Sequence, residues 1–311
     1  MSEEKRLRCR KRNVRSQNQT DKISIRLWKV KNNIGRFILV LAIGTTLVAF
    51  IRFLLSRYGA VVNTFYYFIP LLAVAVTEKS GVLAVLRRYD VGARKTDLRK
   101  SLRYVIVIAL AFPLLNMLCV WFFGNILRIG PFGMFGIPEN DFVLYGIRMP
   151  ENPVLRFASV YLSSVCFALV AGLTYNMFFA LGSEVAWRGF LNRRLRWGRP
   201  MKNVAIGAIW ATWWLSVMIF NGYARSSVAI AYVWFVLLSF LLDAIFRDVR
   251  SLLVTSAVRG IVVSSSCLYF VAGGSPSFNG TTGLAGMISL LVITVCAYVC
   301  KRAAGRHSVE E

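Results

Sequence analysis

The chain has 311 residues, of which 57% are hydrophobic, and it carries 38 Lys and Arg against 14 Asp and Glu, a formal net charge of +24. A soluble domain does not combine that much apolar surface with that much charge, so the two are segregated along the sequence, as in membrane proteins. The basic residues lie between apolar runs and form no soluble fold of their own, which argues against a nucleic-acid-binding module. We therefore expect a lipid bilayer, and no nucleic acid, around this chain.

Apolar runs long enough to cross a bilayer, which takes about 20 residues, recur eight times. They cover residues 36–55, 60–77, 104–127, 155–182, 203–221, 227–246, 251–271 and 283–300. The second run is the weakest because it is short and is broken by Pro70. The pattern predicts an all-α, polytopic membrane helix bundle with about eight transmembrane helices. One domain would span 35–300, between a basic arm at 1–34 and a tail at 301–311.

Positive charge alternates with these apolar runs. Clusters of Lys and Arg lie in residues 5–31, 79–103, 188–202, 247–250 and 301–306, whereas the segments between them are poor in positive charge. Lys and Arg near membrane ends favour the cytoplasmic side, so the alternation predicts that both termini are cytoplasmic. The arm also places Leu27 and Trp28 among cations. This suits contact with an anionic inner leaflet, although a solvated tail that only sets topology explains it equally well.

A few ionisable residues lie inside the apolar runs. Glu184 and Arg188 are four residues apart, so on a helix they share a face and can pair. Arg259 lies about eight residues into its run, too deep to reach the surface, and should point at a carboxylate inside the bundle. The available acids are Glu184 and Asp243. An internal ion-pair network that sets helix register explains these residues at least as well as a catalytic role does.

Three stretches resemble the motifs of the CAAX prenyl protease and bacteriocin-processing (CPBP, or Abi) family of intramembrane metalloproteases. "ALGSEVAWRGFLNRRL" at 180–195 resembles the first motif, Glu-Glu-x-x-x-Arg followed by Gly, an aromatic residue and Leu. "AIGAIWATWWLSV" at 205–217 resembles the second, and "SLLVTSAVRGIVV" at 251–263 resembles the third. The resemblance covers roughly residues 80–300. It implies a membrane helix bundle whose site faces the cytosol, and a multi-pass protein of a bacterial or archaeal plasma membrane.

The family's catalytic residue types are replaced at each equivalent position. The resemblance aligns the first catalytic Glu with Ser183, the second-motif His with Trp214, and the third-motif His and Asn with Arg259 and Val263. Glu184 and Arg188 remain, and the only histidine of the chain, His307, lies near the C-terminal end. The six cysteines show no CxxC spacing. A hydrolytic metal site needs typically three N, O or S ligands and an open position, so we expect neither a metal nor another cofactor.

Two functions follow from this pattern. The first is a non-catalytic member of the protease fold, in which Trp214 and Arg259 fill the former cleft. Such a protein would be a scaffold, regulatory or immunity-type subunit for another membrane protein or a membrane-bound peptide. The alternative is an active CAAX-type endopeptidase with a rearranged site, built on Glu184 with Asp243 or Ser183. Transport through the same buried ions ranks below both, because no pair of Gly- or Pro-interrupted spans recurs in matching halves.

Overall fold

The computed structural model describes residues 33–89, 97–133, 143–144, 147–148, 152–220, 224–265, 275 and 277–307. Nearly all of the basic arm at 1–34, including Leu27 and Trp28, and the last four residues of the tail therefore lie outside the described residues. Helices account for almost the whole of the described chain, as predicted. The described residues also include turns and a two-stranded antiparallel ladder, in which β1 (Val143–Leu144) pairs with β2 (Ile147–Arg148).

The helices follow the apolar runs closely, with one long N-terminal helix at Asn33–Leu54. The others are α2 (Gly59–Tyr66), α3 (Ile69–Glu78), α4 (Val82–Arg88), α5 (Leu98–Trp121), α6 (Pro153–Leu173), α7 (Tyr175–Glu184), α8 (Asn192–Arg194), α9 (Arg199–Phe220), α10 (Arg225–Val249), α11 (Leu252–Ser264) and α13 (Leu284–His307). A short 3-10 turn precedes α2 (η1, Ser56–Tyr58), and wider π-helical turns extend α5 (η2, Phe122–Ile126) and α7 (η3, Val185–Leu191).

Short polar side chains begin several of these helices. The Asp97 carboxylate accepts from the backbone N–H groups of Arg99 and Lys100, and Asn152 and Ser251 cap α6 and α11 in the same way. Such caps satisfy N–H groups that have no partner within the helix. Pro70 interrupts the second apolar run as predicted, because it occupies the first turn of α3, where a missing N–H costs nothing.

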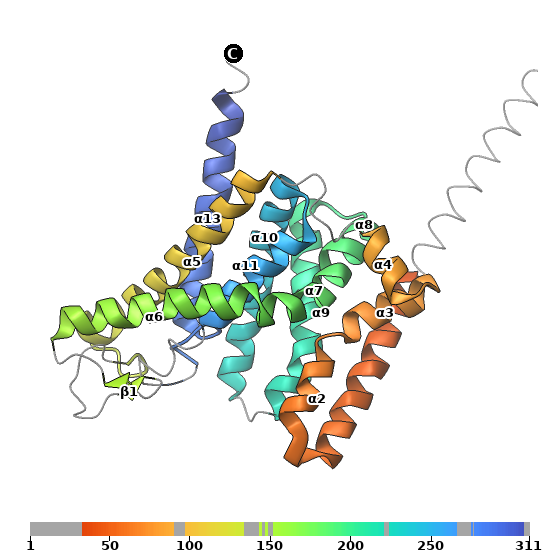
Figure 1. Ribbon diagram of the computed structural model, residues 1–311, viewed down its shortest axis with the longest axis horizontal. Coiled ribbons are helices and arrows are strands. Elements are labelled where there is room, and N and C mark those ends of the chain that lie inside the picture. Colours follow the sequence, from red (N-terminus) through yellow and green to blue (C-terminus); the bar gives the residue numbers. More distant parts are fainter. Residues whose placement is uncertain are drawn as a thin grey trace, which may run out of the picture.

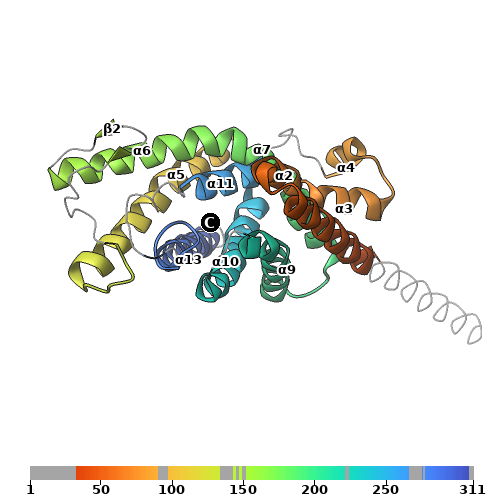
Figure 2. The same cartoon turned by 90° about the horizontal axis from the view of Figure 1, so that it is seen from below.

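The helix α11 lies at the centre of the bundle. It packs against α5, α6, α7 and α10, and all of its residues except Leu253 and Val263 are buried. Figures 1 and 2 show it between the α5–α6 pair on one side and α10 on the other. Arg259 is thus carried on the helix that is most completely enclosed by the others.

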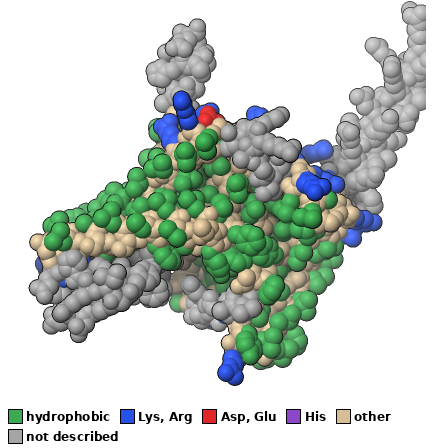
Figure 3. Space-filling model, viewed as in Figure 1, with side chains coloured by type: hydrophobic (Ala, Val, Ile, Leu, Met, Phe, Trp, Pro, Cys, Tyr) green, Lys and Arg blue, Asp and Glu red, His purple; other side chains and the backbone are tan. Residues whose placement is uncertain are grey.

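The outer faces of the described helices are apolar. Along the N-terminal helix, Leu39, Ile43, Leu47, Phe50 and Leu54 recur every three or four residues and are each more than half exposed. On the face in Figure 3, hydrophobic side chains are far more extensive than charged ones, and basic side chains gather mainly where helices end. A soluble monomer rarely exposes so continuous an apolar surface, whereas lipid is a suitable environment for it. The structure therefore fits a multi-pass integral membrane protein.

Four described helices are long and apolar enough to cross a membrane: Asn33–Leu54, Leu98–Ile126, Pro153–Leu173 and Arg225–Val249. A fifth span results if Thr64–Glu78 and Val82–Arg88, bent by 90°, count as one. Within the described residues the structure therefore supports four or five candidate spans, whereas the apolar runs alone predicted eight.

Two predicted boundaries differ from the structure. The run 155–182 is not one helix, because the chain turns at Thr174 (φ −109°, ψ −92°) between α6 and α7. At this break Gly172 packs directly against Ile261 of α11, an approach that hydropathy does not register. The second difference is at the end of the chain, where α13 continues to His307 and so includes much of the tail predicted at 301–311.

Candidate functional site

The first candidate site surrounds Glu184, at the junction of α7 and η3. All seven residues of η3 are buried, and so is Glu184, which immediately precedes them. Arg188 Nε lies 3.5 Å from Glu184 Oε2, so the predicted pair forms. Its setting differs from the expected α-helix, because the intervening residues form a π-helical turn, a geometry that often marks functional positions.

Arg259 reaches the same carboxylate from α11. Its Nη1 lies 3.4 Å from Glu184 Oε1, and it also donates to the Ser183 hydroxyl and to the carbonyl of Ala180. Glu184 is therefore shared between two guanidinium groups. Glu184, Arg188 and Arg259 are all at least 96% buried, and together they carry one more positive than negative charge.

An aromatic ring and backbone carbonyls stabilise this excess charge. The Cζ atom of Arg259 lies 4.4 Å from the centre of the Trp210 ring, and that of Arg188 lies 5.4 Å from it. Arg188 also donates to the carbonyls of Leu238 and Ser239 on α10. A cation over a tryptophan face is attracted by the ring's quadrupole, more strongly where water is excluded. The cluster is thus held by α7, α9, α10 and α11 together.

Two glycines let α11 come close enough for this contact. A Cβ atom on Gly260 would lie 2.2 Å from the Gly172 carbonyl oxygen, and one on Gly172 would lie 2.7 Å from the Ile261 Cα. Small residues at such crossings allow helix backbones to approach in membranes. Asn176 adds a hydrogen bond of 2.8 Å to the Ser264 hydroxyl across the same interface. The sequence pattern singled out Arg259 but not the glycine beside it.

Asp243, the other acid considered, has different partners. Its Oδ2 lies 3.1 Å from Arg247 Nε and accepts a hydrogen bond of 3.1 Å from Asn203. Among the described residues, Arg259 therefore pairs with Glu184, and Asp243 pairs with Arg247. Asn203 and Arg247 were not expected as partners.

The remaining positions that the resemblance aligned with catalytic residues lie among apolar side chains or bond to the backbone. Trp214 is half-buried and packs against the rings of Tyr66, Tyr67 and Phe235, so the tryptophan over the charges is Trp210 and not Trp214. The Ser183 hydroxyl donates to the Ala180 carbonyl at 3.0 Å. Val263 is half-buried. The other two tryptophans of α9, Trp210 and Trp213, are buried.

The donor set around Glu184 does not suit a hydrolytic metal ion. Among the described residues, no three His, Cys, Asp or Glu side chains lie close enough together to hold one. Glu184 is flanked by two cations, which compete with any metal ion for its oxygens and repel the ion itself.

No protein family model, no curated protein and no solved structure matches this chain. The resemblance to the CPBP family therefore rests on the three quoted stretches alone.

A second polar cluster, which the sequence did not reveal, ties α3, α4 and α8 together. Glu78 Oε2 lies 2.7 Å from Arg88 Nη1 and Oε1 lies 3.2 Å from Arg194 Nη2, while the Tyr89 hydroxyl donates to Oε1 at 2.7 Å. Burial, and then this hydrogen bond, raise the pKa of Tyr89 above its usual range. Arg193 lies over the ring of this tyrosine, with its Cζ 4.8 Å from the ring centre.

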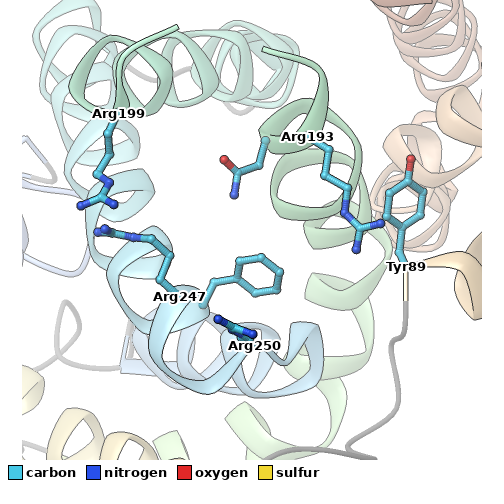
Figure 4. Close-up of a pocket in the computed structure, with 7 residues that line it drawn as sticks. Tyr89, Arg193, Arg199, Arg247 and Arg250 are labelled. Carbon is cyan, nitrogen blue, oxygen red and sulfur yellow. The ribbon is translucent and has the colours of Figure 1, made fainter. Parts of the chain in front are cut away.

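Tyr89 and Arg193 also line a pocket of about 570 Å³. Figure 4 shows its labelled arginines set around one space, with Arg199 and Arg247 pointing toward each other. The lining is completed by residues from the α8–α9 segment and from the end of α10: Asn192, Arg199, Phe246, Arg247 and Arg250. No single stretch of sequence could have indicated this pocket, because its residues come from three separate segments.

Proposed function

We propose that this chain is a non-catalytic membrane protein that serves as a scaffold, regulatory or immunity-type subunit for another membrane protein or a membrane-bound peptide. One observation carries the proposal. The only acid retained from the family's first motif, Glu184, is bound by Arg188 and Arg259, and Trp210 lies against both arginines. A carboxylate with a guanidinium group at each oxygen is poorly placed to take a proton from water.

We also propose that both termini are cytoplasmic and that the chain makes eight passages in a bacterial or archaeal plasma membrane. The arrangement in Figure 1 supports this orientation, since the basic ends of α4, α8, α10 and α13 lie toward one end of the bundle. With 13 residues, α11 would be about 20 Å long, short of the roughly 30 Å hydrocarbon core. Because other helices surround α11, it does not need to match the thickness of the lipid.

A cleavage assay tests the non-catalytic assignment. Purified chain in lipid nanodiscs is incubated with a labelled prenylated peptide, alongside Glu184→Gln and the surface variant Arg225→Gln. No cleavage by any of the three is the expected result. Cleavage by the parent and by Arg225→Gln that is lost in Glu184→Gln would establish the alternative, an endopeptidase with a rearranged site.

Crosslinking within the membrane of the source cells tests the partner. A photo-reactive residue replaces Leu47, which lies on the exposed apolar face of the N-terminal helix. We expect one discrete crosslinked protein or peptide that also copurifies without crosslinking. A monomer that crosslinks only to lipid from this and other exposed positions would contradict the proposal.

A further inference from the structure

The arginine-lined pocket is distinct from the buried Glu184 cluster and has the character of an anion site. Four of its seven lining residues are arginines and none is acidic: Arg193, Arg199, Arg247 and Arg250. Within the described residues only Arg247 of these four forms an ion pair, with Asp243. The other three arginines are exposed and line the same pocket. No Asp or Glu is among the lining residues.

We propose that this pocket binds the phosphate group of an anionic ligand, and that the usual ligand is the headgroup of an anionic phospholipid. Guanidinium groups present planar pairs of N–H donors that match phosphate oxygens, and several of them around one cavity can engage one phosphate together. Basic pockets between helices at a membrane end are suited to acidic headgroups.

The size and position of the pocket favour a headgroup over a bare ion. A volume of about 570 Å³ lies within the range of pockets that hold small organic ligands and exceeds what one inorganic phosphate fills. Phe246 and Tyr89 give the cavity an apolar and aromatic part beside its cations. The pocket also lies at the first residue of α9, Arg199, where the helix dipole adds positive potential.

Arg250 has a left-handed backbone, as do Lys79 and Arg128 outside the pocket. Arg250 ends α10 in the left-handed conformation (φ 52°, ψ 33°), with its N–H bonded to the Phe246 carbonyl. Glycine is the favoured residue at such a helix end, because other residues are strained there. An arginine in this position is unfavourable for the backbone but places a fourth guanidinium group on the pocket.

Native mass spectrometry of the full chain in detergent tests the proposal. The probes are phosphatidylglycerol, electroneutral phosphatidylcholine and the soluble compound glycerol 3-phosphate. The pocket variant is Arg199→Gln/Arg250→Gln. The matched control, Lys79→Gln/Arg99→Gln, removes two exposed charges from the same end of the bundle outside the pocket.

We expect one phosphatidylglycerol per chain to be retained over phosphatidylcholine, with affinity falling roughly tenfold or more in the pocket variant and little in the control. Glycerol 3-phosphate binding as tightly as the lipid, with the same loss in the pocket variant, would support the phosphate site and identify a soluble ligand. Equal losses in the two variants, or no preference for any phosphate anion over phosphatidylcholine, would overturn the proposal.

Discussion

Arg259 Nη1 lies 3.4 Å from Glu184 Oε1, although 75 residues separate the two along the chain. This contact joins α7 to α11 at the centre of the bundle, and Arg188 closes on the other oxygen of the same carboxylate. Removing Glu184 would leave two buried guanidinium groups without a counter-ion in a medium that solvates them poorly, whereas removing either arginine would break a buried ion pair and empty a buried volume. The cluster is therefore the place where single substitutions should have the largest effect on stability.

Replacing Arg188 by alanine should lower the free energy of unfolding by about 2–5 kcal/mol, because a large buried side chain is lost together with its ion pair to Glu184 and its hydrogen bonds from η3 to α10. Unfolding in SDS, followed by circular dichroism, measures the loss. Arg225→Ala, an exposed arginine at the start of α10, serves as the control and should change stability by less than about 0.5 kcal/mol. A parent-like unfolding curve for Arg188→Ala would show that the pair contributes nothing to the fold.

Gly260→Ala should destabilise the protein by about 1–3 kcal/mol, since the new methyl group would meet the Gly172 carbonyl at 2.2 Å. The matched control is Gly35→Ala in the N-terminal helix, where a Cβ meets nothing within 4 Å. There alanine should be neutral or slightly stabilising, because glycine is a poor helix former. Thermal unfolding in detergent compares the two, and equal melting temperatures would contradict the close crossing of α11 and α6.

Arg250→Gly should separate stability from ligand binding. Glycine relieves the left-handed conformation at the end of α10, so we expect a gain of about 1 kcal/mol in the free energy of unfolding without added lipid. The same variant should bind phosphatidylglycerol more weakly than the parent. Melting curves with and without lipid measure both effects, and a loss of stability without lipid would contradict the strain assigned to Arg250.

Membrane orientation is tested with single cysteines in a background in which the six native cysteines are serine. Arg199→Cys lies at the start of α9, at the basic end of the bundle. Arg225→Cys lies at the start of α10, close to where α9 ends and therefore at the opposite end of the bundle. With a membrane-impermeant maleimide, Arg225→Cys should react in intact cells and Arg199→Cys only after permeabilisation. Reaction of Arg199→Cys in intact cells, with Arg225→Cys reacting only after permeabilisation, would show that the termini lie outside the cytoplasm.

The extent of the helices was largely predictable, because each apolar run must satisfy its backbone within itself when it is surrounded by lipid. The Glu184–Arg188 pair was predictable for a similar reason, since residues four apart on a helix are neighbours. The break at Thr174 was not predictable, because no proline marks it. It forms where Gly172 meets α11, and that contact exists only in the packed bundle.

By itself, the sequence determined that this is a helical chain with segregated apolar and basic segments, and that Arg259 needs a buried partner. Only the tertiary structure decided that the partner is Glu184 and not Asp243, that Trp210 and not Trp214 covers the charges, and that four arginines surround one pocket. The physical reason is that hydropathy and charge act along the chain and are visible in its order. Which side chains meet depends on how closely the helices pack, and at α11 that depends on two glycines.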